Sequence, residues 1–378
     1  MFVKKIKIVF FIYRMGGGGA ARTVLNIVNY INKKKFEPIL VTLDFNYNYE
    51  QYINEEIRFV KLNTTRLRSS ILPLAKLIRK EKPEILFSTV ATYNIIAILA
   101  KLISLTKTKI VIREAALLGG KKKENFKLRI IGLFYQLSSK VISLSLGVKN
   151  NLISKYKVKP NKIQVIYNPV DLTNIEQQMQ DEIPQIIQNK KNKNKKIIVT
   201  AGRLVPEKDH FTLLSAFARV NEYVDSELII LGEGELEEEL KEEAKRLQLK
   251  ERVHFVGFKK NPYVYFKHAD VFALSSITEG FGHVFVEAMA CGTPVVTTDC
   301  KPGSEEVLDG GNYGLISRVG NSEELSSNLI QVLQMSGESR EEMINKGLHR
   351  AKLYDAKNIV RQYETTFESL IENNNGEV

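Results

Sequence analysis

Residues 279–296 read EGFGHVFVEAMACGTPVV and contain, in order, a loop, a helix, a tight turn and a strand. The Gly-Phe-Gly loop is followed by a largely apolar run, which predicts a helix over residues 283–291. Gly292 closes this helix where a left-handed residue is favoured, and Pro294 stops its continuation. Val295 and Val296 then predict a buried strand. Such a helix-to-strand unit is typical of an α/β domain.

The start of this helix is a candidate binding site. The free N–H groups of Gly282, His283 and Val284 favour a bound phosphate, both by hydrogen bonding and through the helix dipole. Glu279 precedes the helix, and Glu287 lies about one turn inside it, with a side chain that leans back toward the start. The element therefore has groups for a sugar hydroxyl, a diphosphate and the hydroxyls of a ribose.

The spacing of Glu279 and Glu287 is not specific by itself, because Glu235 and Glu243 repeat it in an acidic stretch. An apolar strand before the loop and the Gly-Thr-Pro-Val-Val turn after the helix make the combination specific. With this context the stretch resembles the signature of the retaining GT-B glycosyltransferases of group 1 and family 4 type, which include bacterial envelope polysaccharide transferases. The resemblance implies that Glu279 orients a hydroxyl of the donor sugar. It implies contacts to a nucleotide-sugar from Gly280, Phe281, Gly282, His283, Val284 and Glu287.

Length, charge and cysteine content bound the class of protein. A chain of 378 residues with 44% apolar content predicts two domains. Residues 1–171 carry 31 Lys and Arg against 10 Asp and Glu, whereas residues 172–378 carry 24 against 33. The basic half suits an anionic membrane surface, a phosphate-bearing acceptor or nucleic acid, although AT-rich codon usage also enriches lysine. Cys291 and Cys300 lack zinc-ligand spacing and fit a reduced, cytoplasmic protein.

Two apolar segments bear on membranes. Residues 8–13 are too short for a signal peptide, and no run approaches the ~18 apolar residues that span a bilayer. Residues 117–137 predict a basic amphipathic helix with Phe126, Ile130, Leu133, Phe134 and Leu137 on one stripe. Such a helix lies on anionic headgroups or packs on its own sheet, and both interpretations stay open. We expect a cytoplasmic protein, either soluble or held peripherally on the inner face of the cell membrane.

Alternating strands and helices predict an open, doubly wound parallel sheet in each half. The predicted strands are residues 5–13, 38–44, 57–62, 85–88, 109–113, 140–145, 163–167, 197–201, 227–231, 253–256, 270–274 and 295–296. Residues 174–196 are rich in Gln, Asn and Lys and predict a linker or flap. The resemblance implies the GT-B architecture of two Rossmann-like domains that face each other across a cleft. The expected divisions are an acceptor-binding domain at 1–171, a nucleotide-sugar-binding domain at 172–355, and a C-terminal helix at 356–378 that crosses back to the first domain.

Residues 202–209, GRLVPEKD, follow the first strand of the second half. They place Arg203 and Lys208 at the carboxyl end of that strand, where ligands bind in open α/β sheets. Two cations there can neutralise a nucleotide diphosphate and the charge that grows as it leaves. The segment matches the phosphate-clamp motif of the family. Gly17 and Gly18 resemble its glycine-rich loop in the first domain, and Gly257 its segment at the base of the nucleotide.

One departure from the family concerns a histidine of the first domain that many members place near the reacting sugar. All five histidines of this chain lie beyond residue 171. The matching region is residues 111–115, and Glu114 is the polar group that would replace the histidine. No Asp-x-Asp sequence occurs, and with two cations on the phosphates neither a metal nor another cofactor is expected.

The leading hypothesis is a retaining glycosyltransferase with Glu279, Arg203, Lys208 and Glu114 in its catalytic site. Its donor would be a UDP-linked hexose or N-acetylhexosamine, and its acceptor a lipid-linked or envelope saccharide. Another GT-B enzyme, an epimerase or phosphorylase, is the first alternative. A catalytically silent GT-B subunit or a basic nucleic-acid-binding protein is less compatible, since the clamp and both glutamates are intact and no nucleic-acid motif occurs. We therefore expect no nucleic-acid partner.

Overall fold

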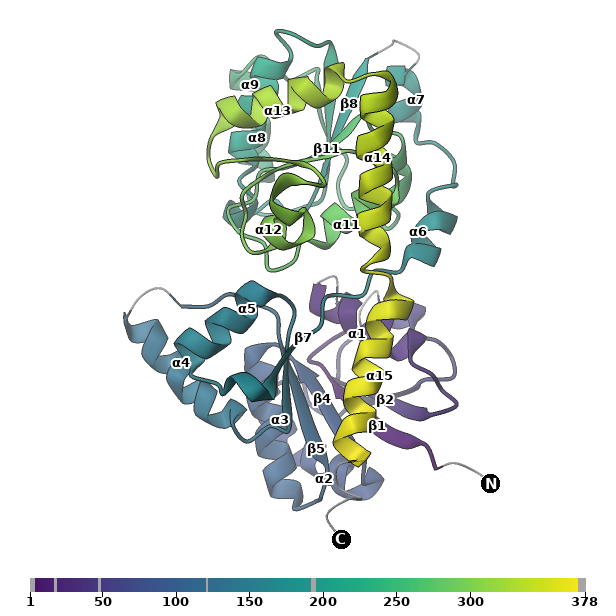
Figure 1. Ribbon diagram of the computed structural model, residues 1–378, viewed down its shortest axis with the longest axis vertical. Coiled ribbons are helices and arrows are strands. Elements are labelled where there is room, and N and C mark those ends of the chain that lie inside the picture. The colour runs from purple at the N-terminus through teal and green to yellow at the C-terminus, as the bar shows by residue number, and fades with distance from the viewer. Residues whose placement is uncertain (1–3, 17–18, 47–48, 120–121, 192–194, 373–378) are drawn as a thin grey trace. The chain divides into compact units, whose positions relative to one another are not determined.

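The computed structural model describes residues 4–16, 19–46, 49–119, 122–191 and 195–372. The chain divides into two compact units, of which unit 1 comprises Met1–Pro169 and Ala356–Val378, and unit 2 comprises Val170–Asp355 (Figure 1). Unit 1 thus ends two residues before the expected division at residue 171. Of the C-terminal helix expected at 356–378, α15 spans Ala356–Glu372 and belongs to unit 1, and residues 373–378 lie outside the described residues.

Unit 1 is built on a seven-stranded parallel sheet in the order β3-β2-β1-β4-β5-β6-β7. Its strands are β1 Ile6–Phe11, β2 Phe36–Leu43, β3 Arg58–Leu62, β4 Ile85–Thr89, β5 Lys109–Glu114, β6 Lys140–Ser143 and β7 Ile163–Val165. Its helices are α1 Gly19–Tyr30, α2 Ile71–Glu81, α3 Ala91–Ser104, α4 Lys122–Tyr135, α5 Leu146–Asn151 and α15 Ala356–Glu372. The apolar strand sequences follow from burial on both faces of a parallel sheet.

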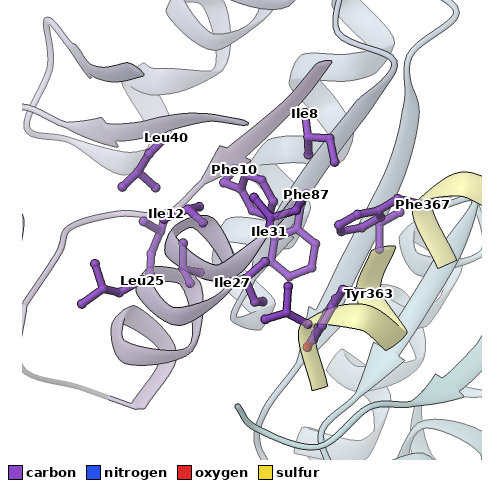
Figure 2. Packing of buried hydrophobic residues seen from close by; sticks show 14 of the residues in the cluster. Ile8, Phe10, Ile12, Leu25, Ile27, Ile31, Leu40, Phe87, Tyr363 and Phe367 are labelled. Carbon is purple, nitrogen blue, oxygen red and sulfur yellow. The ribbon is translucent and has the colours of Figure 1, made fainter. Parts of the chain in front are cut away.

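The core of unit 1 is completed by the C-terminal helix α15. In the register of the sheet Phe10 of β1 pairs with Phe87 of β4, and the centroids of their rings are 5.3 Å apart. Phe367 of α15 packs edge-on against both rings, at 6.3 and 6.2 Å, and Tyr363 lies beside it (Figure 2). All four side chains are fully buried. A helix distant in sequence therefore supplies part of the first hydrophobic core.

Unit 2 is built on a six-stranded parallel sheet in the order β10-β9-β8-β11-β12-β13. Its strands are β8 Lys196–Ala201, β9 Ser226–Leu231, β10 Val253–Phe255, β11 Val271–Leu274, β12 Val295–Thr298 and β13 Leu315–Ser317. Its helices are α6 Leu172–Gln178, α7 Gln185–Lys191, α8 His210–Val220, α9 Glu237–Arg246, α10 Tyr263–Lys267, α11 His283–Ala290, α12 Gly303–Val307, α13 Ser322–Gln334 and α14 Gly337–Lys352. The predicted class, α/β with two doubly wound parallel sheets, is confirmed.

The prediction of a linker over residues 174–196 is wrong for most of its length. Asp171 caps α6 by accepting a hydrogen bond from the N–H of Asn174 at 2.9 Å, and α6 packs against α10 and α11. Ile175 of α6 and Ile187 of α7 are buried. Each helix buries too few apolar side chains to produce a visible period, which is why the composition suggested a linker.

The helix predicted at residues 117–137 is shorter, since α4 begins at Lys122 and ends at Tyr135. Within the described ranges, no helix combines the length and the apolar content that crossing a bilayer requires.

Candidate active site

The predicted site residues of unit 2 gather at one edge of its sheet. Because all its strands are parallel, the loops after β8, β9, β11 and β12 emerge at their common carboxyl edge. The loop after β8 carries Arg203 and Lys208, and the loop after β11 carries Glu279. The topology therefore brings together two segments that lie about seventy residues apart in the sequence, as the ion pair described next shows.

Lys208 and Glu279 are in direct contact. The Nζ atom of Lys208 pairs with Oε1 of Glu279, and the two side chains are only 18% and 14% exposed. Ser276 Oγ donates to the same oxygen at 2.9 Å. Ser275 Oγ donates to the main-chain carbonyl of Lys208 at 3.0 Å. Both serines are buried at the end of β11, and neither was singled out from the sequence.

Arg203 differs from Lys208 in being exposed. Among the described residues it forms no hydrogen bond or ion pair, so its guanidinium is available to an anion. Pro206–Lys208 form one short turn, after which Asp209 caps α8 by accepting hydrogen bonds from Thr212. This turn fixes the main chain at Lys208 beside the end of β8.

The loops after β8 and β9 are packed main chain against main chain. Gly232 has φ +140°, and a Cβ at this position would lie 1.9 Å from the carbonyl oxygen of Gly202. The N–H of Gly232 also donates to the carbonyl of Gly257 at 3.0 Å, which joins the predicted Gly257 segment to the same edge. Only glycine permits this approach, and the approach sets the position of the loop that carries Arg203 and Lys208.

The start of α11 has the expected form. Gly282 is the N-cap residue in the left-handed conformation, followed by half-buried His283 and Val284. The ring of Phe281 is buried against the rings of Tyr354 and His283, with ring centroids 5.1 and 5.4 Å apart. Glu287 is 2% exposed.

Gly303, the first residue of α12, supports Glu279. The N–H of Gly303 donates to the main-chain carbonyl of Glu279 at 2.9 Å. A Cβ on Gly303 would lie 2.9 Å from the Cβ of Glu279 and 2.8 Å from the carbonyl oxygen of Phe281. The start of α12 thus contacts residues 279–281, and a side chain at residue 303 would displace Glu279.

His210, next but one to Lys208, is not a candidate acid. Burial chiefly, with the charge of Lys208, lowers the pKa of His210 to about 4. The imidazole is 1% exposed and is therefore neutral at pH 7.

In unit 1, Glu114 ends β5 and is 1% exposed. Its Oε2 accepts from the hydroxyl of Tyr135 at 2.6 Å, and its Oε1 accepts from the N–H groups of Ala115 and Ala116 at 3.0 and 3.3 Å. Burial raises the pKa of the Glu114 carboxyl. Both oxygens already have protein partners, which favours a positioning role over direct contact with a substrate. The predicted Gly17 and Gly18 lie outside the described residues.

Two family descriptions match the chain. Residues 17–174 match the family Glycosyltransferase Family 4, and residues 181–350 match Glycosyl transferases group 1. A relative from Campylobacter jejuni is 32% identical over 370 residues, which cover 94% of this chain and 97% of the relative. It is an N-acetylgalactosamine-N,N'-diacetylbacillosaminyl-diphospho-undecaprenol 4-alpha-N-acetylgalactosaminyltransferase. An N-acetyl-alpha-D-glucosaminyl L-malate synthase from Bacillus anthracis is 28% identical, over 61% of either chain.

Solved structures agree in fold. A glycosyltransferase from Rickettsia africae has a TM-score of 0.82 at 17% identity, covering 98% of this chain and 100% of its own. HepE from Anabaena, in complex with UDP and glucose, has a TM-score of 0.81 at 21% identity, covering 96% of this chain and 100% of its own. Both likenesses agree with the GT-B fold for this chain.

Proposed function

Because the chain belongs to the group 1 and family 4 glycosyl transferases, we propose that it is a retaining transferase that moves a sugar from a UDP-linked donor to a lipid-linked or envelope saccharide. The observation that carries the proposal is the contact of Lys208 with Glu279, with Arg203 on the same loop as Lys208. One edge of the unit 2 sheet thus presents cations for a diphosphate and a carboxylate for the sugar.

The chemistry divides between these groups. Arg203 and Lys208 would bind the diphosphate and stabilise the charge that it gains as it leaves. Glu279 would accept a hydrogen bond from a hydroxyl of the donor sugar, and Glu287 would bind the ribose. The acceptor would attack from the face that the diphosphate leaves, which retains the configuration at the anomeric carbon. With two protein cations on the phosphates, we propose that no divalent metal and no other cofactor is required.

A thermal-shift experiment tests the donor site. UDP at about 100 times its dissociation constant adds about 2.7 kcal/mol to the free energy of unfolding, which raises the melting temperature. We expect UDP to stabilise the wild type, in EDTA as well as in Mg²⁺, and to stabilise Arg203→Ala much less. Arg219→Ala is the matched control, since Arg219 is a half-exposed arginine of unit 2 that pairs with Glu323. Preferential stabilisation by GDP or ADP would contradict the UDP assignment.

The proposed acceptor is supported by the Campylobacter jejuni relative, whose name includes a diphospho-undecaprenol acceptor. In this chain the surface of α4 is suited to contact with a membrane. The side chains of Leu128 and Tyr135 are buried on the inner side of this helix. Its outer side exposes an apolar stripe: Phe126 at 64%, Ile130 at 44%, Leu133 at 70% and, just past the helix, Leu137 at 56%.

Exposed Lys127 and Arg129 lie on the same helix as this stripe. An amphipathic helix with this arrangement binds the boundary between headgroups and acyl chains of anionic lipid. We propose that α4 holds the protein on the cytoplasmic face of the cell membrane.

Vesicle binding checks the role of α4. The wild type is expected to co-sediment with phosphatidylglycerol vesicles and not with phosphatidylcholine vesicles. Phe126→Ser with Leu133→Ser removes two of the most exposed apolar side chains and is expected to lower binding about tenfold or more. Leu105→Ser is the matched control, since Leu105 at the end of α3 is 86% exposed. Equal binding by the double variant and the wild type would show that another surface contacts the lipid.

A further inference from the structure

We infer that Ser276 is a positioning residue for Glu279, which it holds in place when Lys208 turns toward the diphosphate of the donor. The inference rests on the proposed function and on the hydrogen bonds that Ser275 and Ser276 form at the end of β11.

The two oxygens of the Glu279 carboxylate have different surroundings. Oε1 is shared by Lys208 Nζ and Ser276 Oγ. Oε2 accepts no hydrogen bond from any residue within the described ranges. The side chain is 14% exposed, so the protein holds one oxygen and leaves the other for a ligand. A sugar hydroxyl is the donor group that this free oxygen would accept.

Once a nucleotide-sugar is bound, Lys208 lies near two anions, the carboxylate of Glu279 and the diphosphate of the donor. A diphosphate carries more charge than a carboxylate and accepts strong charge-assisted hydrogen bonds, so it competes with Glu279 for the Lys208 ammonium. The competition grows during transfer, because the leaving diphosphate gains negative charge. Glu279 then depends on its second partner for orientation, and that partner is the hydroxyl of Ser276.

Ser276 is itself fixed. The residue is fully buried, and its main-chain carbonyl accepts a hydrogen bond from Thr298 Oγ1 of the neighbouring strand at 2.6 Å. Its neighbour Ser275 holds the main chain of Lys208 instead. Two adjacent serines at the end of β11 thus hold the two members of the ion pair separately. Motion of Lys208 toward a ligand need not move Glu279.

The test compares the affinities of UDP, UDP-glucose and UDP-N-acetylgalactosamine by calorimetry. Ser276→Cys keeps the packing and replaces the hydroxyl by a weak donor. We expect it to bind UDP within about twofold of the wild type and the better UDP-sugar about tenfold more weakly, since a hydrogen bond to a charged group is lost. Thr200→Val is the control, because Thr200 Oγ1 is buried in the same sheet without a partner among the described residues.

A double-mutant cycle separates positioning from a general structural role. If Ser276 acts through Glu279, Ser276→Cys has no further effect on UDP-sugar affinity in a Glu279→Gln background. The inference would be overturned if the losses of UDP-sugar affinity in the two variants were additive, or if Ser276→Cys lost as much affinity for UDP as for the UDP-sugar. It would also be overturned if the wild type bound neither UDP-sugar better than UDP. Each of these results would leave the proposed UDP binding intact. A wild type that binds no UDP would remove the proposed donor, and the inference with it.

Discussion

Glu279→Gln is expected to lower sugar transfer at least about 100-fold while UDP still stabilises the protein, because the variant loses an interaction with the sugar and keeps the cations that bind the diphosphate. Glutamine preserves the volume of the side chain but cannot form the ion pair with Lys208. Release of UDP from the best UDP-sugar, with an undecaprenyl-diphosphate-linked saccharide as acceptor, measures the loss.

The matched control for this variant is Glu235→Gln. Glu235 is an exposed glutamate of the same unit, placed just before α9. It should leave the rate unchanged, because no part of the proposed site involves it. Wild-type rates in Glu279→Gln would refute the assignment of Glu279, even if UDP binding were normal.

Gly232→Ala is expected to abolish most UDP binding and to destabilise unit 2 by about 3 kcal/mol or more, since overpacking and a left-handed alanine both cost free energy. The added methyl would overlap the carbonyl oxygen of Gly202, 1.9 Å away, and this atom belongs to the main chain. The loop with Arg203 and Lys208 must therefore move. Chemical denaturation and calorimetry with UDP measure the two effects.

The control variant Gly320→Ala separates the cost of a positive φ from the cost of overlap between the added methyl and the main chain. Gly320 also has a positive φ, of +72°, but a Cβ there would meet no atom within 4 Å. The control is expected to cost only about 1 kcal/mol and to keep its affinity for UDP. Full UDP affinity in Gly232→Ala would show that the loop after β8 tolerates displacement.

The sequence predicted the strands well where burial on both faces makes them continuously apolar, as at β1, β8 and β11. It also predicted α11, because the glycine N-cap of this helix and the turn that follows it have a characteristic sequence. The helices α6 and α7 were not predicted because one or two buried apolar side chains in a polar segment give no visible period. The order of strands in each sheet follows from packing between distant segments, which no local pattern records.

In the candidate site, too, residues with a local sequence pattern could be predicted, whereas residues placed only by the fold could not. Arg203, Lys208 and Glu279 could be proposed from the sequence because charged residues at strand ends and a glycine-rich helix start have a local signature. Ser275 and Ser276 were missed, since a serine is common in loops and only the fold shows that one faces Lys208 and the other Glu279. Glu114 was proposed through the family resemblance of residues 111–115, but its contact with Tyr135 depends on how α4 lies against β5.

The return of α15 to unit 1 has a consequence for how the chain matures on the ribosome. Unit 2 is encoded between the two segments of unit 1, so it can close its own core as soon as it emerges. Unit 1 must wait for Tyr363 and Phe367, which delays it by roughly 10–40 s at translation rates of ~5–20 residues per second. During that interval the faces of Phe10 and Phe87 that Phe367 later covers lack their partner. Apolar surface of unit 1 is therefore exposed until α15 is made, and a frameshift that removes α15 leaves the core of unit 1 incomplete.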